Sequence, residues 1–300
     1  MTDIPSSTWF TVAPHWQWLI VFYFFFGGLA GGSYFLAALA DFFGRAEDRP
    51  LARLGYYIAL PCIVFCGLLL IVDLSRPDRF WHILLENHTL RPTFKYWSPM
   101  SIGSWMLLGF GFFSLLSFLG ALAESDRLRW KGARRLRPPG TMGRAIAATG
   151  ALFGLYVAGY TGVLLAVTNR PIWSDTPLLG MLFVISATSI SAALMTLLAR
   201  RRLPGTRTLQ RIDTWAIALV LLVLIGVVVS LGPVARAWLN AWGVLLVFGV
   251  VVLGLLVPLL LRWRTDWLGE RNAAAAAVLV LVGGFLLRTV IVLSSEGVKL

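Results

Sequence analysis

The stretch "GYYIALPCIVFCGLLLIVDLSRPDRFWHILL", residues 55–85, joins two segments of opposite character. Residues 55–72 carry no charge and are long enough to cross a bilayer as a helix, which takes about 20 apolar residues. A charged segment follows at once, with the residues Asp73, Arg76, Asp78, Arg79 and His82. The stretch therefore predicts a membrane-spanning helix that ends at a polar surface.

The rest of the chain repeats the apolar pattern. Of its 300 residues, 58% are hydrophobic and 13% are charged, and its mean hydropathy is +0.79. Soluble proteins carry about 25% charged residues. Helix-length apolar runs occupy residues 16–40, 54–73, 99–123, 143–168, 177–199, 213–232, 238–261 and 273–293. We predict an all-α integral membrane protein in which residues 1–300 form a single polytopic domain of eight transmembrane helices.

The basic residues indicate the orientation of these helices. The net charge is +12, and most of the 26 lysine and arginine residues lie in the loops after the first, third, fifth and seventh runs, as in residues 127–137 and 200–207. Short basic loops stay in the cytoplasm. We therefore expect both termini and the 73–98 loop to be periplasmic, and the positive charge reflects topology rather than binding of nucleic acid. The N-terminal region has no basic residue ahead of the first run, so we expect a retained helix rather than a signal peptide.

Short motifs predict local structure near the helix ends. Ser75 and Asp78 match a capping box, which predicts a short interfacial helix of about ten residues in the 73–98 loop. The pair Ser98-Pro99 predicts the start of the third helix, and Ser174 and Asp175 the start of the fifth. The segment "GGLAGG", residues 27–32, spaces glycines four apart, which favours close helix packing and leaves close approach of a flat ligand open.

Some cofactors are excluded by residue type. The histidines His15, His82 and His88 all lie at the outer edge or in the 73–98 loop, so no helix offers a pair of haem ligands within the bilayer. The cysteines Cys62 and Cys66 are too few for an Fe–S cluster, which takes four thiolates. We expect neither haem, nor a cluster, nor a metal site in this chain.

Polar residues gather at the predicted periplasmic ends of several helices, where a charge costs about 2.5–3.5 kcal/mol to bury. They are His15, Gln17, Asp73, His82, Ser104, Tyr160, Trp173, Arg288 and Glu296. Such residues usually have partners and roles, so this end is the predicted site.

Plainer interpretations stay open for single residues. Arg288 is near enough to the helix end to extend its guanidinium to the headgroups. Asp73 has Arg76 and Arg79 close by in sequence for a structural salt bridge. Tyr160 alone is compatible with ordinary helix packing, His15 with an interfacial anchor beside Trp16, and His82 with a place among the headgroups.

Five segments carry a resemblance to a known family over essentially the whole chain. They are "GGLAGGSYF" (27–35), "DLSRPDRFWHIL" (73–84), "SPMSIGSW" (98–105), "GYTGVLLAVTNRPIW" (159–173) and "GGFLLRTVIV" (283–292). In order and spacing they resemble the NrfD/polysulfide reductase membrane-subunit family. The resemblance implies eight helices in two four-helix bundles, no haem, and a quinone site near the periplasmic face. It also implies docking to a four-cluster Fe–S subunit, which connects to a molybdopterin catalytic subunit.

The resemblance also implies roles for single residues. Tyr160 resembles the tyrosine that hydrogen-bonds a quinone carbonyl, Asp73 the acid that ends the second helix, and His15 or Gln17 the polar entrance of the first. Arg288 and Glu296 resemble polar positions of the last helix, with a proton route as their expected role. We further expect Ser104 and Trp173 to line the site and His82 to relay protons with Asp73. A partner of complementary charge should dock on Arg76, Arg79, Arg91 and Lys95.

We therefore expect a quinone-reactive subunit of a respiratory molybdopterin/Fe–S oxidoreductase in the bacterial inner membrane, inactive without its partners. The quinone type, menaquinone or ubiquinone, the terminal substrate and the direction of electron flow depend on those partners. One alternative is a secondary transporter or ion carrier, which predicts helices broken near the midplane. Another is a membrane anchor without a quinone site. Proton pumping would rest on Asp41, Asp213 and Arg211, which are more simply explained as helix-end charges.

Overall fold

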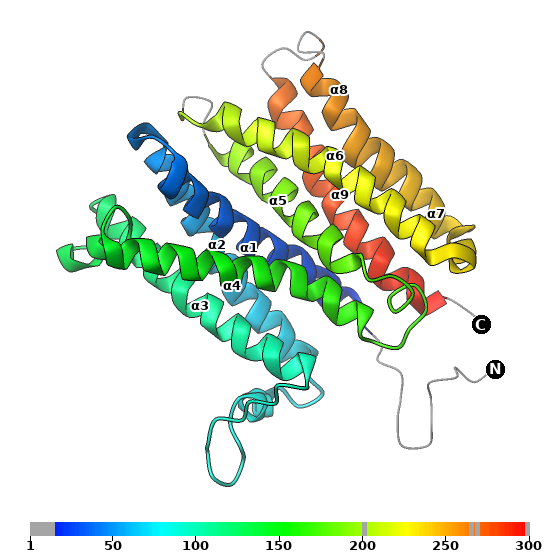
Figure 1. The fold of residues 1–300 in the computed structure, drawn as a ribbon, viewed down its shortest axis with the longest axis horizontal. Helices are drawn as coiled ribbons and strands as arrows, with labels where there is room; N and C mark the ends of the chain where they lie inside the picture. Colours follow the sequence, from blue (N-terminus) through cyan, green and yellow to red (C-terminus); the bar gives the residue numbers. More distant parts are fainter. Residues whose placement is uncertain (1–15, 200–202, 264–266, 268–270, 298–300) are drawn as a thin grey trace.

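The computed structural model describes residues 16–199, 203–263, 267 and 271–297, and helices dominate it (Figure 1). Eight helical stretches are long and apolar enough to cross a membrane, which confirms the predicted all-α class and the eight spans. Their bounds are α1 (Trp18–Phe43), α2 (Arg49–Asp73), α3 (Pro99–Glu124), α4 (Thr141–Ala166), α5 (Leu179–Leu198), α6 (Thr206–Leu231), α7–η5–α8 (Ala241–Trp263) and α9 (Asn272–Ser294).

Two helices extend well beyond their apolar runs. The apolar runs place the start of the second helix at residue 54 and that of the sixth at residue 213, but α2 begins at Arg49 and α6 at Thr206. Hydropathy marks only the part of a helix that matches the hydrocarbon core, and charged first turns continue beyond it. The seventh span is continuous, because α7 (Ala241–Val244) passes into the π-helix η5 (Leu245–Leu256) and then into α8 (Val257–Trp263).

The helices run nearly side by side, with α1–α4 on one side of the molecule and α5–α9 on the other (Figure 1). Helix α1 is central, because it packs against α2, α4, α5 and α9. The start of α1 and the end of α9 lie at the same end of the molecule as the loop between α2 and α3 (Figure 1). We call this the outer end, and the opposite end, which carries the basic loops, the inner end.

Glycines let α1 occupy its central place. A Cβ atom added at Gly31 would overlap the backbone carbonyl of Gly154 in α4, and one added at Gly32 would lie 2.6 Å from the carbonyl oxygen of Ala187 in α5. Only residues without a side chain permit this approach. Residues 27–32 therefore serve helix packing, which was the favoured interpretation of their spacing.

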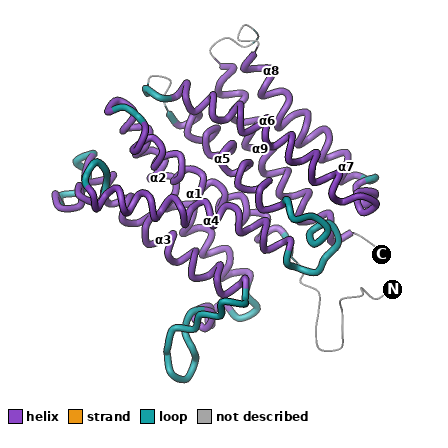
Figure 2. The backbone as a smooth tube through the Cα atoms, in the orientation of Figure 1, coloured by secondary structure: helices purple, strands orange, loops and turns teal. Residues whose placement is uncertain are grey.

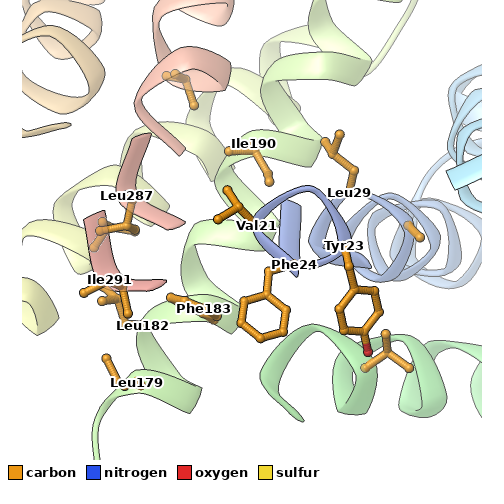
Figure 3. Close-up of a cluster of buried hydrophobic side chains, with 14 of the residues drawn as sticks. Val21, Tyr23, Phe24, Leu29, Leu179, Leu182, Phe183, Ile190, Leu287 and Ile291 are labelled. Carbon is orange, nitrogen blue, oxygen red and sulfur yellow. The ribbon is translucent and has the colours of Figure 1, made fainter. Parts of the chain in front are cut away.

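The apolar core lies where α1, α5 and α9 meet (Figure 3). Phe24 of α1 and Phe183 of α5 pack edge to face with their ring centroids 5.9 Å apart, and both are fully buried. Leu287 and Ile291 of α9 close the same cluster. The polar residues of the outer end are held against this core.

The loop at the outer end contains a short helix followed by a longer irregular segment (Figure 2). Backbone hydrogen bonds order it in part, such as that from the N–H of Thr93 to the carbonyl of Leu84 at 2.8 Å. It begins with a 3-10 helix, η2 (Pro77–Ile83), so a short helix is present, but it is shorter than predicted and Arg76, not Ser75, occupies the N-cap. At the far end of the loop, the Ser98 side chain accepts a hydrogen bond from the backbone N–H of Ser101 and caps α3, as predicted. The indole N–H of Trp105 donates to the carbonyl of Thr93 at 3.0 Å and fastens the loop to α3.

The fifth helix begins differently from the prediction. Its N-cap is Leu178 rather than Ser174 or Asp175. The Ser174 hydroxyl donates to the carbonyl of Arg170, and the Asp175 carboxylate accepts from the backbone N–H of Ile172. Ile172 has a positive φ of 72°, a conformation that the turn requires. Both polar residues therefore stabilise the preceding turn instead of capping the helix.

Buried ion pairs fasten the inner end. Arg137 binds Asp41 at 2.6 Å and also Glu124, whose carboxylate is shared with Arg49 at 2.8 Å. On the other side of the molecule, Asp213 pairs with Arg262 and accepts a hydrogen bond from Ser189. The carboxylates of Asp41 and Asp213 are thus neutralised by arginines, which is a structural role beyond that of simple helix-end charges.

Candidate functional site

The polar residues of the outer end form three groups rather than one cluster. Tyr160 lies in a groove between α4 and α5, Arg288 lies at the junction of α1, α5 and α9, and Asp73 and His82 lie at the loop. The predicted residue His15 falls outside the described residues. Gln17 is exposed and N-caps α1, and its backbone carbonyl accepts from the N–H of Ile20.

Tyr160 is held by the first turns of α3. Its hydroxyl donates to the backbone carbonyl of Pro99 at 2.6 Å, and its ring fills the space left by the missing side chain of Gly103. A tyrosine hydroxyl has one proton to donate and keeps lone pairs that accept. In this state Tyr160 therefore accepts a hydrogen bond from a ligand but has none to donate.

Tyr160 also lines a groove with a volume of about 470 Å³ on the outer half of α4 and α5. The walls are apolar apart from two tyrosine hydroxyls, and they are formed by Leu155, Tyr156, Gly159, Tyr160, Val163, Pro177, Gly180, Met181, Val184 and Ile185. Met181 is 48% exposed, so the groove opens on the side of the molecule that faces lipid. We call it the α4/α5 groove.

The sequence prediction missed Tyr156. Its ring stacks on that of Tyr160 with centroids 5.6 Å apart and planes at 17°. Within the described ranges its hydroxyl makes no hydrogen bond, so it is free to donate. The four-residue spacing from Tyr160 puts both rings on one face of α4 and was the available signal. Ser104, by contrast, donates to the carbonyl of Met100 in its own helix at 2.8 Å.

Arg288 is completely buried and does not extend to the headgroups, so that simpler interpretation is wrong. Its Nε atom donates to the carbonyl of Phe24 at 3.0 Å, and Nη1 donates to the Ser186 hydroxyl and to the carbonyl of Gly284 at 3.1 Å and 2.8 Å. Its Nη2 atom is buried without a partner, and no carboxylate pairs with it among the described residues. Arg288 thus joins α1, α5 and α9 as an uncompensated charge.

Trp173 and Glu296 lie above Arg288, toward the outer end. The indole N–H of Trp173 donates to the carbonyl of Ile291 at 2.7 Å, and its fully buried ring stacks on Trp16 at 5.2 Å. Glu296 pairs at 3.1 Å with Arg170, which the sequence prediction missed although it stands three residues before Trp173. Trp173, Arg288 and Glu296 therefore belong to one region, which we call the α1/α5/α9 seam, and Tyr160 belongs to another.

The loop residues are free of strong internal pairing. Asp73 is exposed and forms no ion pair in the part of the chain that the structure describes, so the salt-bridge interpretation is wrong; Arg79 instead lies 3.8 Å from Asp78. The Nε2 atom of His82 is buried without a hydrogen-bond partner. The predicted docking residues are all exposed: Arg76, Arg79, Arg91 and Lys95. We call these four the docking cations.

The thiols and the other acidic groups offer no ligand set. Cys66 is buried with its sulfur 3.6 Å from the carbonyl of Tyr23, and Cys62 is half-buried. Across residues 16–199, 203–263, 267 and 271–297, no three His, Cys, Asp or Glu side chains gather as a metal site would require. The side chains at the outer end can hydrogen-bond the polar groups of a largely apolar ligand, and they can exchange protons.

Comparison with known proteins identifies the family of this chain. Residues 11–297 match the family described as "Polysulphide reductase, NrfD". Protein NrfD of Escherichia coli (strain K12) is 27% identical over 94% of this chain and 95% of that protein. A polysulfide reductase chain of Wolinella succinogenes is 28% identical over 58% of this chain and 55% of that protein. A selenate reductase subunit of Mesobacillus selenatarsenatis is 31% identical over 34% of this chain and 21% of that protein. With its eight spans, this chain is a multi-pass protein of the bacterial inner membrane and belongs to the NrfD polysulphide reductase family.

Proposed function

We propose that this chain is the quinone-reactive membrane subunit of a respiratory molybdopterin/Fe–S oxidoreductase and that the α4/α5 groove holds the quinone or quinol head group. The observation that carries the proposal is an apolar groove of about 470 Å³ whose hydroxyls, those of Tyr156 and Tyr160, lie on one face of α4. Small-molecule sites are commonly apolar, of about 300–1,000 Å³, with few polar groups. The relatives named as parts of polysulfide and selenate reductases support a redox role.

The groove suits an amphiphilic carrier. Its exposed side admits an isoprenoid tail from the lipid, and its apolar walls accept a flat ring. The free Tyr156 hydroxyl donates to a quinone carbonyl, and the Tyr160 oxygen accepts from a quinol hydroxyl. For Tyr160 to donate to a quinone carbonyl, its proton must leave the carbonyl of Pro99. We retain His15 and Gln17 as contacts of the carrier at the outer end, whereas Ser104 is not among the residues that line the groove.

Protons and electrons leave by the outer end. Oxidation of a quinol releases two protons and two electrons, and we assign proton transfer to Asp73 and His82. The exposed, unpaired carboxylate of Asp73 and the buried, unpaired Nε2 of His82 support this role, because a group already held in an ion pair exchanges protons poorly. The electrons pass to a four-cluster Fe–S subunit, and from it to a molybdopterin subunit.

The docking loop and the groove share one anchor. The first two turns of α3 hold Tyr160 through Pro99 and hold the loop through Trp105, and the Ser101 hydroxyl accepts from the backbone N–H of Lys95 at 3.1 Å. We infer that the Fe–S subunit binds the docking cations through an acidic surface, close to the head group. Charge complementarity of this kind fixes register more than affinity.

The α1/α5/α9 seam has a supporting role in this proposal. Arginine does not release its proton in proteins, so Arg288 acts by its charge. Glu296 is retained as the acid of the predicted proton route, although its ion pair with Arg170 makes it a weaker candidate for proton transfer than Asp73. Trp173 holds α9 against the start of α1. We also propose that α1–α4 and α5–α9 form two four-helix bundles and that the outer end, with both termini, is periplasmic. The position of the basic loops at the inner end supports this orientation.

The experiment is quinone-linked turnover in the assembled complex. Tyr160→Phe and Asp73→Asn should each lower turnover at least tenfold while the complex still assembles. The matched control is Tyr34→Phe, which also removes a tyrosine hydrogen bond to a backbone carbonyl, that of Ile146 at 3.2 Å, but in the inner half. Wild-type rates in both test variants would refute the assignment. A purified complex that carries no quinone and ignores quinone-site inhibitors would indicate the membrane anchor instead.

A further inference from the structure

We propose that the inner end carries a binding site for an anionic phospholipid, in a cleft between α2, the start of the α3–α4 loop and the end of α5. The site rests on the proposed orientation, with the inner end in the cytoplasm, but not on the proposed redox function. The cleft has a volume of about 290 Å³ and is lined by Pro50, Arg53, Leu54, Tyr57, Ser125, Arg127, Leu198 and Leu203. It is the counterpart, at the opposite end of the molecule, of the α4/α5 groove.

The shape of the cleft follows from one face of α2. Its lining residues on α2 are Pro50, Arg53, Leu54 and Tyr57, which share a single helical stripe. At their inner ends, Leu51 of α2 shares an apolar cluster with Met195 and Ala199 of the end of α5, and the cleft opens beside this cluster, where Leu198 is 50% exposed. The stripe lines the cleft, and the ring of Tyr57 also packs edge to face on Phe118 of α3 with the centroids 5.5 Å apart. Leu54 and Leu198 supply an apolar wall against which an acyl chain can lie.

The charges of the cleft lack counterions. The guanidinium groups of Arg53 and Arg127 form no hydrogen bond or ion pair with any residue that the structure describes. The acids nearest in sequence to Arg127 are already paired, because Glu124 binds Arg49 and Arg137, and Asp126 binds Arg134. The hydroxyls of Tyr57 and Ser125 are also engaged, with the carbonyls of Ala121 and Leu122. Two free guanidinium groups thus face one cleft.

Two free guanidinium groups beside an apolar wall indicate the class of ligand. Guanidinium groups bind phosphate oxygens through paired N–H donors. A basic cleft between helices at the cytoplasmic side of a membrane protein is the recognised setting for an anionic headgroup. A soluble phosphate ester would use the two arginines but leave the apolar wall exposed. A phospholipid uses both, so we assign the phosphate to Arg53 and Arg127 and the acyl chain to the leucine wall.

The experiment is native mass spectrometry of the full-length protein with phosphatidylglycerol or phosphatidylcholine. The wild-type protein should retain phosphatidylglycerol in preference to phosphatidylcholine. The change Arg53→Gln with Arg127→Gln should weaken phosphatidylglycerol binding by about fivefold for each arginine, the weight of one cation near an anionic surface. The matched control is Arg129→Gln with Arg144→Gln, which removes two exposed charges from the same end and should change nothing.

Three results would overturn the proposal. Equal retention of phosphatidylglycerol and phosphatidylcholine by the wild-type protein would refute the preference for an anionic lipid, whatever the variants show. An equal loss of phosphatidylglycerol in the control would show a general surface effect. Displacement of the lipid by millimolar glycerol 3-phosphate would assign the cleft to a soluble phosphate ester. If the double variant does not fold, the single variants Arg53→Gln and Arg127→Gln each carry the expected fivefold loss.

Discussion

Two buried arginines should respond to the same substitution with opposite signs. Arg288 is 0% exposed and Arg137 is 2% exposed, yet only Arg137 pairs with carboxylates. Replacement by methionine keeps most of the side-chain volume and removes the charge at both positions. We predict that Arg288→Met leaves stability unchanged or raises it, and that Arg137→Met lowers it.

The expected magnitudes follow from the groups left behind. Arg288→Met removes three hydrogen bonds, but two of their acceptors, the carbonyls of Phe24 and Gly284, lie inside helices and keep their backbone N–H partners. It also ends the burial of an unpaired charge. Replacing a buried ion pair by apolar residues of similar volume is often neutral or stabilising by about 1–4 kcal/mol, and we expect the same sign for an arginine that has no carboxylate partner. Among the residues that the structure describes, Arg137→Met leaves the buried carboxylate of Asp41 with the Tyr56 hydroxyl as its one hydrogen-bond donor, which should cost about 3–5 kcal/mol.

The assay is thermal unfolding of both variants in one detergent, followed by tryptophan fluorescence. The midpoint of Arg288→Met should match or exceed that of the wild-type protein, and that of Arg137→Met should fall. The double change Arg137→Met with Asp41→Asn should recover part of the loss, because it removes the stranded charge. A fall for Arg288→Met as large as that for Arg137→Met would refute the reasoning. A stable Arg288→Met protein with impaired quinone-linked turnover would show that this charge serves function at the expense of stability.

Three further predictions concern packing and docking. Gly31→Val should lower stability by about 1–3 kcal/mol through overpacking against α4. Gly67→Val, where no atom lies within 4 Å of the added Cβ, should leave the unfolding midpoint unchanged. If Gly31→Val and Gly67→Val unfolded at the same midpoint, the packing role of Gly31 would be contradicted. Trp173→Phe loses the indole hydrogen bond and should destabilise the protein by about 1–2 kcal/mol, measured in the same assay. Glutamate at the docking cations should weaken co-purification of the Fe–S subunit, most at low salt; Arg144→Glu at the inner end serves as control, and equal losses would argue against docking there.

Much of this fold was predictable from hydropathy, because a spanning helix needs an apolar run of fixed length whatever surrounds it. The depth of a polar residue is equally readable, at about 1.5 Å of rise per residue. The rotation of each helix is not. Tyr160 and Arg288 were both expected at the outer end, but they point into different interfaces of the bundle, one beside Pro99 and the other beside Phe24. The sequence prediction grouped these two residues because they lie at a similar depth in the membrane. In the structure they are apart because α4 and α9 turn them toward different neighbouring helices.

Long-range pairing was the other limit. Arg137 and Asp41 are 96 residues apart, and the counting of basic residues that indicates orientation treats Arg137 as one loop charge among several. Nothing local marks it as buried. Tyr156, in contrast, was within reach, since its four-residue spacing from Tyr160 places it on the same face of α4.

Photolabelling of the assembled complex with an azido-quinone, followed by peptide mapping, tests the central claim most directly. We predict labels on residues 155–163 of α4 and on residues 177–185 in and just before α5, and weaker labelling when Tyr160→Phe and Tyr156→Phe are combined. Labels confined to α1 and α9 around Arg288, or spread evenly over the lipid-facing helices, would contradict a head-group site in the α4/α5 groove.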